Sequence, residues 1–81
     1  MRVTVRLFAR LRDIAGTADL GRDVESGATI STVWRQLVRD FPDFASYERS
    51  ISCAINADYS RMDHAVHDGD DIAFLPPVSG G

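Results

Sequence analysis

One helical pattern limits the fold of this chain more than any other feature of its sequence. Thr29 belongs to the residue types that cap helices, and Pro42 would end a helix that began there. Between them, apolar residues recur at the spacing i, i+3, i+4, i+7, i+8 and i+11. This stripe consists of Ile30, Val33, Trp34, Leu37, Val38 and Phe41. We therefore predict one main helix from Thr29 to Phe41, which packs its apolar face, Trp34 included, on the core.

The segments on both sides of this helix have the two-residue period of strands. Residues 2–8 alternate cleanly, and residues 18–25 form a weaker pattern that should pair with them. After the helix, residues 51–56 and 71–75 alternate in the same way, and residues 59–62 indicate a short additional strand. We expect each clear strand to bury one of its faces.

Two connecting segments differ from the strands. Residues 9–15 lack alternation and contain good helix formers, and Gly16 is a natural C-terminal stop, so we predict a short helix there. Residues 43–50 are predicted to be a polar connection that carries Phe44 and Tyr47, with one turn of helix as an alternative within it. The order of elements indicates an α+β fold with a mixed sheet of four to five strands, one main helix and one short helix. A β-grasp and a ferredoxin-like domain both fit this order.

Size and charge limit the possible functions. Eighty-one residues suffice for one domain and one core, but not for a deep enclosed substrate pocket, which favours a carrier or adaptor over a self-sufficient enzyme. The net charge of −3 argues against a nucleic-acid-binding module. No apolar run approaches membrane-spanning length and no signal-peptide pattern begins the chain, so we expect a soluble, cytoplasmic protein.

The last residues are the most informative about function. Asp68-Gly69-Asp70 predicts a turn before the last strand, and Pro76-Pro77 would end that strand because proline cannot donate a ladder hydrogen bond. We expect residues 1–75 to form the domain and residues 76–81 a flexible tail, which reaches at most about 20 Å when extended. Glycine has no Cβ, so a Gly80-Gly81 end could enter a narrow active site of another protein and present a reactive carboxylate. A frayed end without a function is the alternative.

This succession of turn, apolar strand, Pro-Pro-Val-Ser and Gly-Gly resembles the C-terminus of the small, sulfur-carrying subunit of molybdopterin synthase, in the MoaD/ThiS family of ubiquitin-like proteins. The segments Leu7–Thr17 and Ala54–Asn56 resemble the same family. The resemblance implies a β-grasp rather than a ferredoxin-like domain. It also implies that the carboxylate of Gly81 is adenylated and then converted to a thiocarboxylate, with Gly80 as its required neighbour.

The resemblance further implies a client and partners. The sulfur would go to cyclic pyranopterin monophosphate in molybdenum cofactor biosynthesis. The large subunit of molybdopterin synthase would bind the pterin and supply the catalytic residues within a heterotetramer, so the chain is no enzyme by itself. The other partners would be a ubiquitin-activating-like adenylyltransferase and a sulfur donor of the cysteine desulfurase or rhodanese type. We expect no tightly bound cofactor, and ATP would be used by the activating partner.

Docking residues follow less directly from the resemblance. The candidates for partner contacts are Phe8, Arg12, Phe74, Leu75, Pro76, Pro77 and Val78. Leu75 departs from the family pattern, in which an aromatic residue is frequent at this position. The alternatives are a sulfur carrier for thiamine, cysteine or tRNA thiolation, and a ubiquitin-like modifier of protein amines. All nine basic residues are arginine, so an activated C-terminus would find no side-chain amine on its own chain.

Cysteine and histidine do not indicate another site. Cys53 cannot form an internal disulfide, and we read it as a small core residue because no histidine close in sequence would activate it. His64 and His67 have a spacing that would suit one helical face, but the helical pattern is absent around them. No cysteine or carboxylate cluster completes a ligand set, so we predict no metal site.

Overall fold

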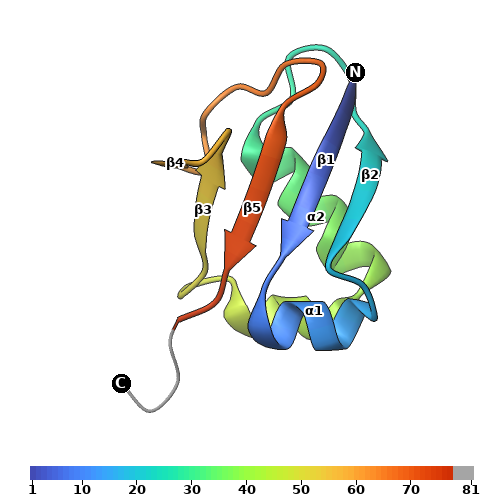
Figure 1. Cartoon of the computed structure of the whole chain (residues 1–81), viewed down its shortest axis with the longest axis vertical. Coiled ribbons are helices and arrows are strands. Elements are labelled where there is room, and N and C mark those ends of the chain that lie inside the picture. The colour runs from blue at the N-terminus through green and yellow to red at the C-terminus, as the bar shows by residue number, and fades with distance from the viewer. Residues whose placement is uncertain (78–81) are drawn as a thin grey trace.

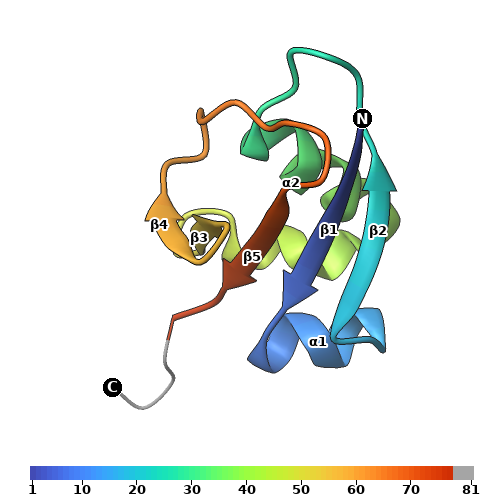
Figure 2. The ribbon, with the colours of Figure 1, turned by 45° about the horizontal axis from the view of Figure 1, so that its top comes forward.

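The computed structural model describes residues 1–77, which form a five-stranded mixed sheet with α2 lying across one of its faces (Figures 1 and 2). The elements in chain order are β1 (Arg2–Leu7), α1 (Ala9–Ala15), β2 (Asp19–Asp23), α2 (Ile30–Asp40), the 3-10 helix η1 (Pro42–Tyr47), β3 (Ser52–Ile55), β4 (Asp58–Ser60) and β5 (Asp71–Leu75). Along the sheet the strand order is β2-β1-β5-β3-β4, so the first and last strands lie side by side.

The pairing of β1 with β5 is parallel, and every other strand pair is antiparallel. A parallel pair requires a crossover connection, and here the intervening chain contains α2, which covers one face of the sheet. A helix packed across a mixed sheet in which the first and last strands of the chain pair in parallel is the β-grasp, or ubiquitin-like, arrangement. The predicted α+β class and β-grasp fold are confirmed.

The main helix forms because its start is capped and one face is continuously apolar. The side chain of Thr29 accepts a hydrogen bond from the backbone amide of Thr32, and the hydroxyl of Thr32 accepts one from the amide of Thr29. The helix ends at Asp40, one residue before the predicted end, with Phe41 in the C-cap position. The buried residues of α2 are Ile30, Val33, Trp34 and Leu37.

An aromatic cluster joins α2 to the sheet. The ring of Trp34 lies 5.5 Å from that of Phe44 and 5.1 Å from that of Phe74, centroid to centroid. All three side chains are fully buried, and burial of each contributes roughly 1.5–3 kcal/mol. The segment after α2 was predicted to be a polar connection that carries Phe44, and the structure adds that η1 places this ring in the core. The structure therefore has a third helical segment, η1, beyond the predicted main and short helices.

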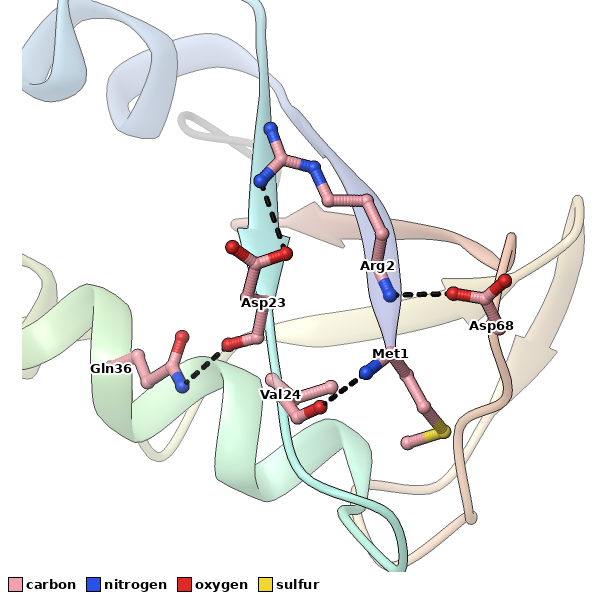
Figure 3. A network of polar contacts seen from close by, with 6 residues as sticks. All are labelled: Met1, Arg2, Asp23, Val24, Gln36 and Asp68. Atoms are coloured by element: carbon pink, nitrogen blue, oxygen red, sulfur yellow. Dashed lines mark hydrogen bonds and ion pairs between the residues drawn. The ribbon is translucent and has the colours of Figure 1, made fainter.

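The opposite end of the sheet from the C-terminal tail is held by polar contacts around β1 (Figure 3). The amino group of Met1 donates to the carbonyl of Val24 at 2.7 Å, and the backbone amide of Arg2 donates to Asp68 Oδ1 at 2.7 Å. The guanidinium of Arg2 reaches across to Asp23 Oδ1 at 3.1 Å. These contacts tie the start of β1 to the end of β2 and to the turn before β5.

Candidate functional site at the root of the tail

The parallel pairing of β1 and β5 determines where the C-terminal tail leaves the domain. Leu7 lies opposite Phe74, so both strands end together, and β1 continues into α1 at the point where β5 continues into Pro76 and Pro77. The end of β5 at Leu75 matches the predicted strand end. Val78, Gly80 and Gly81 lie outside the described residues, so the predictions for them remain predictions.

A surface groove of about 530 Å³ lies at this exit, and we call it the tail-root groove. Its lining comes from the start of α1, the end of η1 and the end of β5, and it is mostly apolar. The lining residues are Phe8, Ala9, Arg10, Asp13, Tyr47, Leu75, Pro76 and Pro77. Four of the predicted docking residues, Phe8, Leu75, Pro76 and Pro77, are therefore brought together in one place.

The position of Phe8 in the structure differs from the one that the strand pattern predicted. We expected it at the end of the first strand, but β1 ends at Leu7 and Phe8 is the N-cap of α1. The next residue, Ala9, has a φ of 52°, a left-handed value that is uncommon for a residue with a Cβ. The chain turns sharply there, and the side chain of Phe8 remains 43% exposed.

Two other predicted docking residues do not join the groove. Phe74 is fully buried against Trp34, so its side chain has no surface to offer a partner, and its prediction as a docking residue is corrected. Alternation along β5 places Phe74 on the core face and the adjacent Leu75 on the opposite, partly exposed face. Arg12 is exposed on α1 but does not line the groove, and its proposed docking role remains a prediction.

Tyr59 is an exposed aromatic residue that the sequence analysis did not select. It lies on β4 opposite Ala54 and is 81% exposed, on the face of the sheet that α2 leaves open. Ala54 in turn pairs with Ala73 of β5, so small residues separate Tyr59 from the centre of the open face. The aromatic residue between Asp58 and Ser60 in a short edge strand was the signal that could have indicated an exposed ring.

The open face of the sheet also carries an ion pair close to the centre. Arg6 Nε lies 2.9 and 2.7 Å from the two carboxylate oxygens of Asp71 on the neighbouring strand. The hydrogen bond to Asp71, followed by the negative charge of Asp71, raises the pKa of Arg6 above its ordinary value. Arg6 therefore stays charged, and the pair supports the alignment of β1 with β5 rather than proton transfer.

Cys53 is buried, whereas His64 and His67 are both exposed. Cys53 is buried on β3, its Sγ lies 3.3 Å from the carbonyl oxygen of Ser60, and burial raises its pKa, so the nucleophilic thiolate is disfavoured. The chain between His64 and His67 is not helical, because Ala65 forms a bridge to Thr29. Within residues 1–77 no group of three or more histidine, cysteine or acidic residues is arranged to hold a metal ion. No helix of this described part has the length and apolar character to span a membrane.

Comparison with known proteins confirms the β-grasp fold and identifies the family. The model of the ThiS family matches residues 5–81. The molybdopterin synthase sulfur carrier subunit of Arabidopsis thaliana is 34% identical over 79 residues, which cover 98% of this chain and 82% of that protein. The crystal structure of SAMP1 from Haloferax volcanii is 30% identical, covers all of both chains and superposes with a TM-score of 0.85. A complex of subunits 1 and 2 of the molybdopterin-converting factor from Helicobacter pylori contains a chain of the same fold, at 22% identity and a TM-score of 0.69 over the whole of both chains. The chain belongs to the ThiS family, within the ubiquitin-like proteins that include the molybdopterin synthase sulfur carrier subunits.

Proposed function

We propose that this protein is a sulfur carrier whose terminal Gly81 accepts sulfur and donates it to cyclic pyranopterin monophosphate in molybdopterin synthesis. The observation that carries the proposal is that β5 leads into Pro76 and Pro77 beside an apolar groove, with Gly80 and Gly81 three and four residues beyond Pro77 in the sequence. The 34% sequence identity to the molybdopterin synthase sulfur carrier subunit of Arabidopsis thaliana supports this choice of sulfur acceptor.

The proposed chemistry takes place on the terminal carboxylate. A carboxylate is a poor electrophile, so a ubiquitin-activating-like adenylyltransferase would first convert it with ATP to a mixed anhydride with AMP and release pyrophosphate. The outer sulfur of a donor persulfide would attack the carbonyl carbon and displace AMP. A thiol would then attack the donor's cysteine sulfur and form a disulfide with it, which breaks the bond to the transferred sulfur and leaves Gly81 as a thiocarboxylate.

The domain itself contributes delivery rather than catalysis in this proposal. From Pro77, the four residues that end at Gly81 reach at most about 14 Å, so the domain can stay outside a partner while the carboxylate enters its active site. Cys53, the cysteine of the chain, is buried and unsuited to nucleophilic attack. The chain would therefore be no enzyme by itself. The large subunit would supply the catalytic residues, and the cysteine desulfurase or rhodanese would supply the sulfur. The association of subunits 1 and 2 in the Helicobacter pylori complex supports such a partner.

A ubiquitin-like modifier is the second candidate. Its support is the similarity to SAMP1 of Haloferax volcanii, which is named a small archaeal modifier protein. The modifier route begins with the same adenylation but ends in an amide bond to an amine of another protein. Sulfur carriers for thiamine, cysteine or tRNA thiolation differ from the leading proposal only in the acceptor of the sulfur.

Intact mass measurement tests the proposal. The full chain and a variant without Gly81 are incubated with ATP, the adenylyltransferase and a persulfide donor. We expect the full chain to gain the mass difference between sulfur and oxygen, and the shortened chain to remain unchanged. Addition of the large subunit with cyclic pyranopterin monophosphate should return the loaded chain to its original mass. An unchanged mass of the full chain, together with lysine-linked adducts on other proteins, would contradict the carrier function and favour the modifier.

A further inference from the structure

We propose that the free edge of β2 binds an extended, basic segment of another protein, which adds a strand to the sheet at Gly21. The segment would carry arginine or lysine at two positions four residues apart, with a small or β-branched residue midway between them. This inference concerns a surface other than the tail and does not depend on the proposed function.

β2 is the longer of the two outer strands of the sheet, and its hydrogen bonds to β1 use every second residue (Figure 1). The amide of Val24, just beyond the end of β2, donates to the carbonyl of Met1 at 2.8 Å. In an antiparallel pair, residues whose backbone groups point toward the neighbouring strand alternate with residues whose groups point away. The backbone groups of Asp19, Gly21 and Asp23 therefore point away from β1, toward the free edge.

The carbonyls at both ends of this edge are already occupied, and its centre is open. The hydroxyl of Thr17 donates to the carbonyl of Asp19 at 2.8 Å, and the side-chain amide of Gln36 donates to the carbonyl of Asp23 at 3.3 Å. Within residues 1–77, no loop or side chain forms a hydrogen bond with the amide or carbonyl of Gly21. A strand added here would form a pair of backbone hydrogen bonds with Gly21, as in β-strand addition.

The side chains along this edge form an acidic row. Asp19 and Asp23 flank Gly21 on the open face of the sheet, and Glu25 follows beyond the end of β2. In the part of the chain that the structure describes, neither Asp19 nor Glu25 belongs to an ion pair. Asp23 pairs with Arg2, but its side chain remains 78% exposed. The row can therefore accept further positive charge from outside.

β1 shows which kind of segment matches this row. Its open-face residues are basic, polar and basic, and they lie opposite the acidic, glycine and acidic residues of β2. The pairs are Arg2 with Asp23, Thr4 with Gly21 and Arg6 with Asp19. A strand with the same alternation on the outer side of β2 would meet the same row, and opposite charges directly across a sheet are stabilising.

A groove continues the edge on the side of α2. It has a volume of about 410 Å³ and lies between the end of β2 and the first half of α2, with Glu25, Thr32 and Gln36 in its lining. An added strand that extends beyond Asp23 would reach this groove, because its side chains alternate between the two faces of the sheet. The polar lining and the carboxylate of Glu25 suit a polar or basic residue of the incoming segment.

A second copy of this chain does not suit the edge. Antiparallel pairing of two β2 strands about Gly21 would place Asp19 of one copy opposite Asp23 of the other. Like charges directly across a sheet are destabilising, and charged edges protect sheets from pairing with themselves. The acidic row therefore favours a basic strand of a different protein.

A peptide that copies residues 1–7, with both ends blocked, is the probe, because it carries the side chains with which β2 already pairs. It is titrated into the full, isotope-labelled chain, and the NMR shifts of backbone amides report where it binds. One variant of the peptide carries Arg2→Glu and Arg6→Glu, which reverses its charge and keeps its length.

Two further peptides separate backbone pairing from attraction between charges. One is N-methylated at Thr4, whose amide should donate to the carbonyl of Gly21. Its matched control is N-methylated at Val5, whose amide should point away from the sheet.

Substitutions in the protein test the acidic row. The test variant carries Asp19→Asn and Asp23→Asn. The control variant carries Asp58→Asn and Asp63→Asn, which change the net charge equally at exposed positions on and beside β4, the opposite edge of the sheet.

We expect the copied peptide to shift the amides of Asp19, Gly21 and Asp23, and the glutamate variant to bind roughly tenfold more weakly or not at all. Methylation at Thr4 and the test substitutions should each weaken binding roughly fivefold or more, whereas both controls should change it less than about twofold.

Three results would overturn the inference. The first is an absence of binding by the copied peptide. The second is equal binding of the two methylated peptides, because backbone pairing with β2 would then be absent. The third is a set of shifts that extends to the indole of Trp34, because the peptide would then replace β1 within the sheet instead of adding to its edge.

Discussion

Replacement of Phe74 by leucine tests whether this residue stabilises the core beside the tail-root groove or contacts a partner directly. The ring of Phe74 is fully buried and lies 5.1 Å from that of Trp34. Leucine lacks three of the side-chain carbons, so at about 0.8 kcal/mol for each buried carbon group the substitution should cost about 2 kcal/mol. A domain of this length has an expected stability of roughly 4–12 kcal/mol, so the variant should remain folded.

The assay is urea unfolding followed by the fluorescence of Trp34, which reports directly on the packing at Phe74. With an expected slope of about 1 kcal/mol per molar urea, the midpoint should fall by about 2 M. Tyr59→Ala is the control, because this exposed ring should change stability by less than about 0.5 kcal/mol. At a temperature where it is folded, Phe74→Leu should bind the adenylyltransferase like the wild type. An unchanged midpoint combined with weaker binding would refute the reasoning and make Phe74 a docking residue.

Three further predictions concern pH, reactivity and helix capping. Hydrogen bonds from the side chain of Asn56 and from a backbone amide lower the pKa of Asp70, so this carboxylate stabilises the fold above its unfolded pKa of about 3.9. That stability should be lost as the pH falls through the lower, folded pKa. Asp70→Asn should flatten the dependence of the urea midpoint on pH below about 4, and an unchanged slope would contradict this. Arg10→Lys would place an amine at the tail root, so with ATP and the adenylyltransferase but no sulfur donor this variant should lose the mass of one water. The wild type and an Arg35→Lys control, whose lysine would lie on the exposed side of α2, should keep their mass. An unchanged mass of Arg10→Lys despite AMP release would refute the expectation. Thr29→Ala should destabilise the protein by about 1 kcal/mol in calorimetric unfolding, and a change below about 0.3 kcal/mol would mean that the capping box contributes little.

Local patterns in the sequence were sufficient to predict most helices and strands, and they suggested the C-terminal chemistry on which the proposed function rests. The helix at residues 9–15, its stop at Gly16 and the strand at residues 71–75 have the predicted bounds, because periodicity and capping depend on neighbours within a few positions. The Gly80-Gly81 end, on which the proposed function rests, was also visible in the sequence alone.

The tertiary structure decided which faces are buried and which distant residues meet. Alternation places Phe74 and Leu75 on opposite faces of the strand but does not say which of them faces α2. Only the packing of α2 on one face of the sheet shows that Phe74 lies in the core. The polar segment after α2 contained no signal that Phe44 would be buried or that Tyr47 would face the tail. The tail-root groove joins Phe8, Tyr47 and Pro77 from three separate segments, through the parallel pairing of β1 with β5. Such contacts depend on how the strands and helices pack, which local sequence patterns do not encode.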